Sequence, residues 1–333
     1  MESLKDFGIT GVVTWHQTDI REEMRPSAFL NIAQELANFH ADKLGFGYDD
    51  LIKSEQVWVL SRIRVKFNRV LRWRDKFYAA TWHKGVQGLF GMRDFALFES
   101  DCKMEVTPQS IKEAAITGTS AWLIMNTRTR RIERRNPFVM NEHSLSMTNP
   151  MDAMEEGCDK LHIPQELYLK WSHQVRYTDM DFNMHANNAK YIEWVMDSVD
   201  IEQLKNYRIT EFQINYIQEA HFGDKVDIYS SLPDNSSTNP QLEIFYVGKR
   251  GDSVIFECKL DIIRETGREP NLLPTGLLRE GGPISRVLYP LRGFYHLSSA
   301  AYPPAKSEQP LTAGIHGLAG CSGIPQRCRH PNA

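Results

Sequence analysis

The chain has 333 residues, a formal net charge of −3 and a mean hydropathy of −0.43, with 24% charged residues. This size favours two domains, and the mild acidity gives no general footprint for nucleic acid. No apolar run reaches the roughly eighteen residues that predict a membrane span. The N-terminus lacks the basic and apolar regions of a signal peptide, which predicts a cytoplasmic protein.

The five cysteines are scattered, without the close pairing that metal sites and disulfide frameworks use. The sequence therefore predicts reduced thiols, no metal site and no cofactor. The five are Cys102, Cys158, Cys258, Cys321 and Cys328.

The first half begins with a β-prone run, 11–17, that ends at Thr18-Asp19. Apolar residues then recur at three- and four-residue steps, which predicts a helix with Pro26 in its first turn and Gly45 after its end. The stripe comprises Phe29, Ile32, Ala33, Leu36, Ala37 and His40. Strand-like runs follow at 57–65, 77–82, 90–98 and 121–125, so the unit is expected to be α+β.

The second half repeats this order. Thr178-Asp179 lies 160 residues after Thr18-Asp19, and a predicted helix follows it, with Asn187 or Asn188 available as the N-cap. Its stripe is Tyr191, Ile192, Val195 and Val199, and strand-like runs follow at 212–216, 241–248 and 253–264. An Asp-Lys pair comes eight residues after a strand in both halves, so the fold is predicted to be duplicated.

These landmarks divide the chain into an N-terminal repeat at 1–135, a linker at 136–170 and a C-terminal repeat at 171–266. The remaining segment, 267–333, contains nine Gly and nine Pro, which predicts poorly ordered chain. A run of arginines precedes the linker and is either a solvated face or a dock for an acidic partner. It comprises Arg128, Arg130, Arg131, Arg134 and Arg135.

The polar stretch before the second helix carries the candidate chemistry. Asp181, Asn183 and His185 alternate, so an extended segment would turn their side chains to one side, beside a helix N-terminus that favours developing negative charge. Glu219 ends an apolar strand, where an unpartnered charge is uncommon. The structural alternative is a polar loop with an Asx turn and a helix cap.

Comparison of the repeats favours a functional role for this set. Alignment of the Thr-Asp pairs places Arg21, Glu23 and Arg25 opposite the three alternating residues, and alignment of the Asp-Lys pairs places Val70 opposite Glu219. The first repeat is therefore expected to have the fold without the chemistry.

The motif Asp181-x-Asn183-x-His185-x-Asn187-Asn188-x-Lys190-Tyr191, with Glu219 36 residues after Asn183, resembles the acyl-[acyl carrier protein] thioesterases of bacteria and plant plastids. The resemblance extends over residues 119–131 and the first helix, and covers about 5–266. It implies a tandem double hotdog, in which an antiparallel sheet wraps a long central helix in each repeat. It also implies hydrolysis of a fatty acyl thioester on an acidic acyl carrier protein, which ends fatty acid synthesis.

Two features depart from the family. Plant members commonly have Cys after the Glu, whereas Ala220 stands here, so direct attack by water is expected. The segment after Gly267 resembles nothing in the family.

The expected roles follow from this resemblance and from the chemistry of helix ends. The amides near Asn187 and Asn188 would hold the thioester oxygen, Asn183 would hold substrate or water, and Asp181 would orient its neighbours. Either Glu219 or His185 would deprotonate the water. The first repeat would supply the acyl pocket, with candidates Trp58, Phe67 and Trp73.

Other functions stay open at this point. They are a hotdog acyl-CoA thioesterase, a hotdog hydratase or dehydratase, and a lipid-binding module without catalysis. The pairing of Asn183 with Glu219 favours hydrolysis. Acyl chain length and a homodimer are also left open.

Overall fold

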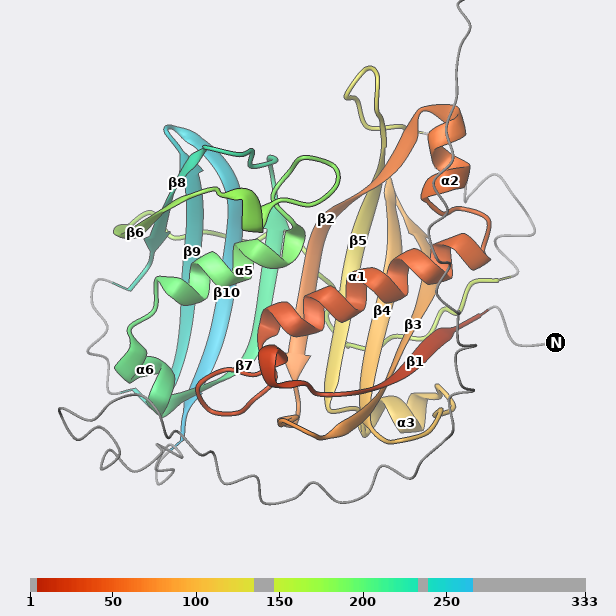
Figure 1. Cartoon of the computed structure of the whole chain (residues 1–333), viewed down its shortest axis with the longest axis horizontal. Helices are drawn as coiled ribbons and strands as arrows, with labels where there is room; N and C mark the ends of the chain where they lie inside the picture. The colour runs from red at the N-terminus through yellow and green to blue at the C-terminus, as the bar shows by residue number, and fades with distance from the viewer. Residues whose placement is uncertain (1–4, 135–146, 233–238, 266–333) are drawn as a thin grey trace, which may run out of the picture. The chain divides into compact units, whose positions relative to one another are not determined.

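The computed structural model describes residues 5–134, 147–232 and 239–265. Ten strands form one antiparallel sheet in the order β1-β3-β4-β5-β2-β7-β10-β9-β8-β6. Helices α1 (Pro26–Lys43) and α5 (Asn188–Asp197) lie end to end across one face of it (Figure 1). The strands are β1 (Phe7–Val12), β2 (Gln56–Phe67), β3 (Lys76–Gln87), β4 (Phe90–Glu99), β5 (Ile116–Asn126), β6 (Tyr168–Gln174), β7 (Tyr207–Tyr216), β8 (Lys225–Ser230), β9 (Gln241–Arg250) and β10 (Ser253–Arg264).

The two halves of the sheet have the same topology. Each begins with an edge strand and ends with its second strand at the centre, where β2 pairs with β7 from Arg62↔Asn215 to Lys66↔Glu211. The expected α+β duplication is therefore confirmed, and the repeats share a continuous hydrogen-bonded sheet. The shorter helices are α2 (Tyr48–Leu51), α3 (Pro108–Lys112) and α6 (Ile201–Asn206).

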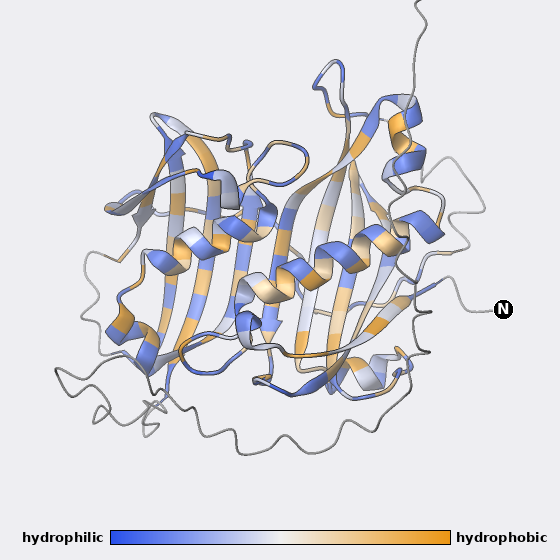
Figure 2. Ribbon diagram, in the orientation of Figure 1, coloured by the Kyte–Doolittle hydropathy of each residue, from blue (hydrophilic) through white to orange (hydrophobic). Residues whose placement is uncertain are grey.

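The hydrophobic core lies between the helices and the sheet and runs through both repeats. Apolar residues recur along the strands that lie behind α1 and α5 (Figure 2). At the seam the rings of Phe67 and Phe212 lie 6.1 Å apart, and Trp194 on α5 is fully buried. Burial of this continuous apolar surface holds the two repeats together.

The first helix begins at Pro26 as expected, because proline suits a position whose N–H has no helical partner. The second helix is shorter than expected. It ends at Asp197, and Val199 is buried just beyond it, before α6 continues the chain.

One strand prediction is wrong, and two strands of the structure were not predicted. The first strand is Phe7–Val12, and Trp15–Gln17 forms a 3₁₀ turn instead of continuing the β-prone run. The sequence pattern does not reveal β6 or β8, because β6 is mostly exposed and β8 is only six residues long. Both lack the apolar run that makes a strand visible in a sequence.

A segment of the expected linker covers the outer face of the first repeat. The Trp82 indole donates to the Met151 carbonyl at 2.8 Å, and the Ala153 amide donates to Asp94 Oδ2 at 2.7 Å.

No helix among the described residues is long and apolar enough to cross a membrane. The segment 267–333 lies outside the described residues, as do Cys321 and Cys328; the other three cysteines are free thiols.

Candidate active site

The polar stretch before α5 is a tight turn and not an extended segment. Asp181 Oδ1 accepts the Asn183 amide at 2.9 Å, and the Asp181 amide donates to the His185 carbonyl at 2.9 Å. Met184 has a φ of 62°, in the left-handed region. The expectation that simple alternation aligns the three side chains is therefore wrong, and the Asp181 carboxylate instead forms the turn.

The first repeat contains the same turn. Asp19 Oδ1 accepts the Arg21 amide at 2.8 Å, and the Asp19 amide donates to the Glu23 carbonyl at 2.9 Å. Glu22 has a φ of 61°, which matches the left-handed residue of the second repeat. In both turns the aspartate side chain accepts an amide two residues further on, which explains an Asp at the same position of each repeat.

These hydrogen bonds correct the alignment of the repeats. Asp19 corresponds to Asp181 and Glu23 to His185, at a spacing of 162 residues, so the Thr-Asp alignment is wrong by two. The aspartate is common to both repeats and is explained by the turn. The histidine at position 185 occurs only in the second repeat.

The alignment of Val70 with Glu219 is confirmed. The amide of Met24 donates to the Leu71 carbonyl in the first repeat, as that of Ala186 donates to the Ala220 carbonyl in the second. These equivalent bonds place a valine where the second repeat has its carboxylate.

In the first repeat, charged groups neutralise one another where the second repeat has its histidine. Glu23 Oε1 lies 3.4 Å from Arg21 Nη2 and 3.2 Å from Arg72 Nη2, and the Glu23 side chain is buried. The first repeat thus uses this position for an internal ion pair.

The N-terminus of α5 supplies one unused amide. The Asn187 side chain caps the helix by accepting the Ala189 amide at 2.9 Å, while the Asn187 amide donates to the Asp179 carbonyl at 2.8 Å. In the described part of the chain, no acceptor takes the amide of Asn188, whose carbonyl accepts the Tyr216 hydroxyl at 2.9 Å. Of the two amides expected to hold an oxyanion, that of Asn188 is available.

Replacement of Asn187 by alanine removes this cap and is expected to lower the free energy of unfolding by about 1 kcal/mol. Chemical denaturation of the variant and the wild type measures the difference. An Asn187→Asp variant, which keeps the acceptor, should stay near the wild type, and equal losses in both variants would contradict the capping role.

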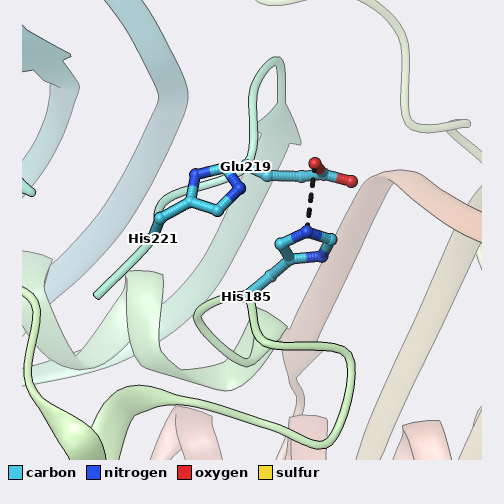
Figure 3. Close-up of side chains that lie close together, drawn as sticks. All are labelled: His185, Glu219 and His221. Carbon is cyan, nitrogen blue, oxygen red and sulfur yellow. Dashed lines mark ion pairs between the residues drawn. The ribbon is translucent and has the colours of Figure 1, made fainter. Parts of the chain in front are cut away.

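Figure 3 shows the side chains that meet above this helix end. His185 Nε2 lies 3.3 Å from Glu219 Oε2, and the ring of His221 packs edge-on against that of His185 at 5.0 Å. The three side chains place one ligand atom each within 4.8 Å of one another, a donor set that zinc accepts. The carboxylate of Glu219, however, already pairs with a cationic side chain.

That cation is Arg130, which donates from Nη2 to Glu219 Oε2. It comes from the hairpin that follows β5 in the first repeat, opposite the turn before α5 (Figure 1). The other arginines of the run differ. Arg128 Nε pairs with Glu55 Oε2 at 2.9 Å, and Arg131 and Arg134 are exposed. Arg135 lies outside the described residues.

The loop that carries Glu219 is held by its neighbours. The Tyr191 hydroxyl accepts the Ala220 amide at 3.2 Å, and burial raises the pKa of Tyr191 to about 12, so the phenol stays neutral. Arg250 donates to the Glu219 carbonyl at 3.3 Å and to Asp224. Burial raises the pKa of Asp224, but the His221 amide and Arg250 outweigh it and lower this pKa below its usual range.

A cavity of about 1140 Å³ opens at the His185–Glu219 pair and is lined by both repeats. Of the three residues expected in an acyl pocket, Trp58 lines this cavity. Phe67 and Trp73 do not, since Phe67 packs at the seam and Trp73 packs edge-on against Trp15 at 4.8 Å. The apolar wall includes Ala37, Leu44, Phe46, Trp58, Leu60 and Trp122.

The cavity also reaches a buried polar group in the first repeat. Arg93 Nη1 lies 2.9 Å from His40 Nδ1 and 3.2 Å from Thr81 Oγ1, and burial lowers the pKa of Arg93 to about 9. Burial, with the neighbouring charge of Arg93, lowers the pKa of His83 to about 3. His83 is therefore a neutral ring whose Nδ1 accepts the Gly85 amide at 2.8 Å.

Sequence reasoning missed Arg130, His221, Tyr191 and Arg250 as parts of this site. His221 stands two residues after Glu219 and could have been noticed. The contact of Arg130 with Glu219 joins residues 89 apart and has no local signal.

Two family models match the chain: the acyl-ACP thioesterase N-terminal domain over residues 11–142 and the acyl-ACP thioesterase C-terminal domain over 162–275. Among curated proteins, the chain is 26% identical over 234 residues to the oleoyl-acyl carrier protein thioesterase, chloroplastic, of Coriandrum sativum, covering 66% of this chain and 61% of that protein. It is 28% identical over 223 residues to the dodecanoyl-[acyl-carrier-protein] hydrolase, chloroplastic, of Cinnamomum camphora, covering 63% of this chain and 55% of that protein. The chain thus spans little more than half the length of these relatives.

Solved structures agree with the sequence matches. A crystal structure of an acyl-ACP thioesterase from Bacteroides thetaiotaomicron aligns with a TM-score of 0.65 and 25% identity, over 80% of this chain and all of that one. The 12:0-ACP thioesterase from Umbellularia californica aligns with a TM-score of 0.64 and 22% identity, over 80% of this chain and 99% of that one. At this identity the match supports the fold alone. The expected double hotdog is confirmed, and the chain belongs to the acyl-ACP thioesterase family.

Proposed function

We propose that the protein hydrolyses the thioester of a fatty acyl-[acyl carrier protein] and releases the free fatty acid. The observation that carries this proposal is the pairing of His185 with Glu219 beside an unused helix amide, at the mouth of a cavity with an apolar wall. A base, an oxyanion donor and a chain-binding wall are the three parts that acyl hydrolysis needs.

The reaction proceeds by direct attack of water. The thioester carbonyl lies over the N-terminus of α5, where the Asn188 amide stabilises the developing oxyanion. The Glu219–His185 pair takes a proton from water, whose oxygen attacks the carbonyl carbon. The C–S bond then breaks, the pantetheine sulfur leaves as a thiol with that proton, and the acyl group leaves as a carboxylic acid. Ala220 offers no thiol for an acyl-enzyme route.

Asp181 and Asn183 support this pair in different ways. Asp181 organises the turn that presents His185, because it bonds the Asn183 amide and the His185 carbonyl. Asn183 is exposed and lines the cavity mouth, where its amide can hold the water or the thioester. The acyl chain extends along Trp58 into the first repeat.

The acyl carrier protein docks on the basic hairpin of the first repeat. Arg131 and Arg134 are exposed there, near the cavity mouth that also includes Arg130 and Ile132. Exposed charges steer an acidic partner and are screened by salt.

Raising the salt concentration is expected to lower kcat/KM for acyl carrier protein substrate, because screening weakens attraction to Arg131 and Arg134. From about 0.05 to about 0.5 M salt the loss should be roughly tenfold. A small acyl thioester without a carrier is the control and should be nearly insensitive. Equal sensitivity of both substrates would contradict carrier docking by charge.

The proposed function is tested by thiol release from carrier proteins loaded with acyl chains from short to long. Release of thiol and fatty acid is expected, with a higher kcat/KM than for the same chains on coenzyme A. Faster turnover on coenzyme A would favour the acyl-CoA thioesterase. Loss or gain of water at the acyl chain without thiol release would identify a hydratase or dehydratase, and binding without turnover a lipid-binding module.

A further inference from the structure

The candidate active site is completed by a residue of the first repeat. Arg130 reaches across the repeat boundary to the carboxylate of Glu219. The inference drawn from this contact rests on the proposed role of Glu219 in thioester hydrolysis.

The hairpin holds Arg130 in a defined place. Asn126 Oδ1 accepts the amides of Arg128 at 3.1 Å and Thr129 at 2.8 Å, and the Arg130 amide donates to the Asn126 carbonyl at 2.9 Å. Arg130 itself has a φ of 56°, and the Thr127 amide anchors the hairpin base on the Glu55 carbonyl at 2.7 Å. A turn with this many internal hydrogen bonds fixes the direction in which the Arg130 side chain leaves the backbone.

The contact with Arg130 leaves the two carboxylate oxygens of Glu219 in different surroundings. Oε2 accepts from Arg130 and lies 3.3 Å from His185 Nε2. Across the described ranges, Oε1 accepts no hydrogen bond, and the side chain is 28% exposed at the cavity mouth. A carboxylate anchored through one oxygen presents the other in a fixed direction, as a base needs.

We propose that Arg130 is a positioning residue that anchors Glu219 through Oε2, so that Oε1 meets the attacking water. The planar guanidinium suits this role, because it directs its donors in a fixed plane and always carries its charge. The catalytic centre therefore depends on both repeats, although the first repeat holds no base of its own. Arg128, two residues away, pairs with Glu55 and does not line the cavity.

The test compares Arg130→Ala, Arg130→Lys and Arg128→Ala on two substrates, an acyl carrier protein and a pantetheine thioester of the same acyl chain. Arg130→Ala is expected to lower kcat about 10- to 100-fold on both substrates, with KM for the pantetheine thioester little changed. Arg130→Lys should recover part of kcat, because it restores the charge without the planar fork. Arg128→Ala should match the wild type on the pantetheine thioester.

A double-mutant cycle locates the action of Arg130. In a Glu219→Gln background, Arg130→Ala should change kcat less than about twofold, because the group it positions is already lost. The same loss in both backgrounds would overturn the proposal, as would a loss confined to the carrier substrate. Since Arg130 is half exposed, all variants should melt at the wild-type temperature.

The outcomes separate this role from the proposed function. Wild-type protein that releases no thiol from any acyl thioester overturns the hydrolase and, with it, the role of Arg130. Wild-type turnover together with an Arg130→Ala variant of unchanged kcat overturns the role of Arg130 alone.

Discussion

Replacement of Glu219 by glutamine is expected to lower kcat for acyl carrier protein substrate about 10²–10⁴-fold, the usual contribution of a positioned acid or base. Glutamine keeps the size and one oxygen acceptor, but it loses the charge that pairs with Arg130 and cannot accept a proton. KM should change little, because the proposed role of Glu219 is at the water and not at the acyl chain. Thiol release under saturating substrate measures the effect.

The control is Glu55→Gln, a carboxylate that pairs with Arg128 of the same hairpin and lies outside the cavity lining. It should keep wild-type kcat. If Glu219→Gln also keeps wild-type turnover, the site assigned to hydrolysis is wrong. If His185→Ala alone abolishes turnover, the base is the imidazole and not the carboxylate.

Acid is expected to destabilise the protein through His83. Its pKa is about 3 in the folded protein, against 6.5 for a histidine exposed to water, so the unfolded chain binds the proton more readily. The stability that the neutral ring contributes is complete above about pH 6.5 and is lost as the pH falls towards 3, at about 1.4 kcal/mol per pH unit. The physical reason is burial, joined by a geometric one: a protonated Nδ1 cannot accept the Gly85 amide.

The measurement is the free energy of unfolding by urea between about pH 7 and about pH 4, for the wild type and His83→Asn. Asparagine can place Oδ1 where Nδ1 accepts the Gly85 amide, and it does not titrate. The slope against pH should therefore be shallower in the variant by about 1.4 kcal/mol per pH unit in this range. His162→Asn, at an exposed histidine, should keep the wild-type slope. Parallel slopes for all three proteins would contradict a neutral His83.

The sequence by itself determined the features that depend on neighbouring residues. The period of Phe29 to His40 and the position of Pro26 predicted α1, since helix formation depends on contacts three and four residues apart. The Asp-Lys landmarks predicted the duplication, and the motif around His185 predicted the family. Both are patterns of residue spacing that can be compared along the chain. Asn187 was one of two predicted caps, and the hydrogen bond to Ala189 selects it.

Only the tertiary structure decided which distant groups meet. The hydrogen bonds of two equivalent turns placed Asp181 opposite Asp19, where counting from a repeated Thr-Asp pair gave the wrong register. The packing of Trp73 against Trp15 kept it out of the cavity that Trp58 lines. Arg130 looked like one of five surface charges, and the antiparallel seam of β2 with β7 brings its hairpin to Glu219. A sequence pattern reports spacing along the chain, whereas an ion pair between the repeats depends on which strands of the two repeats pair with each other.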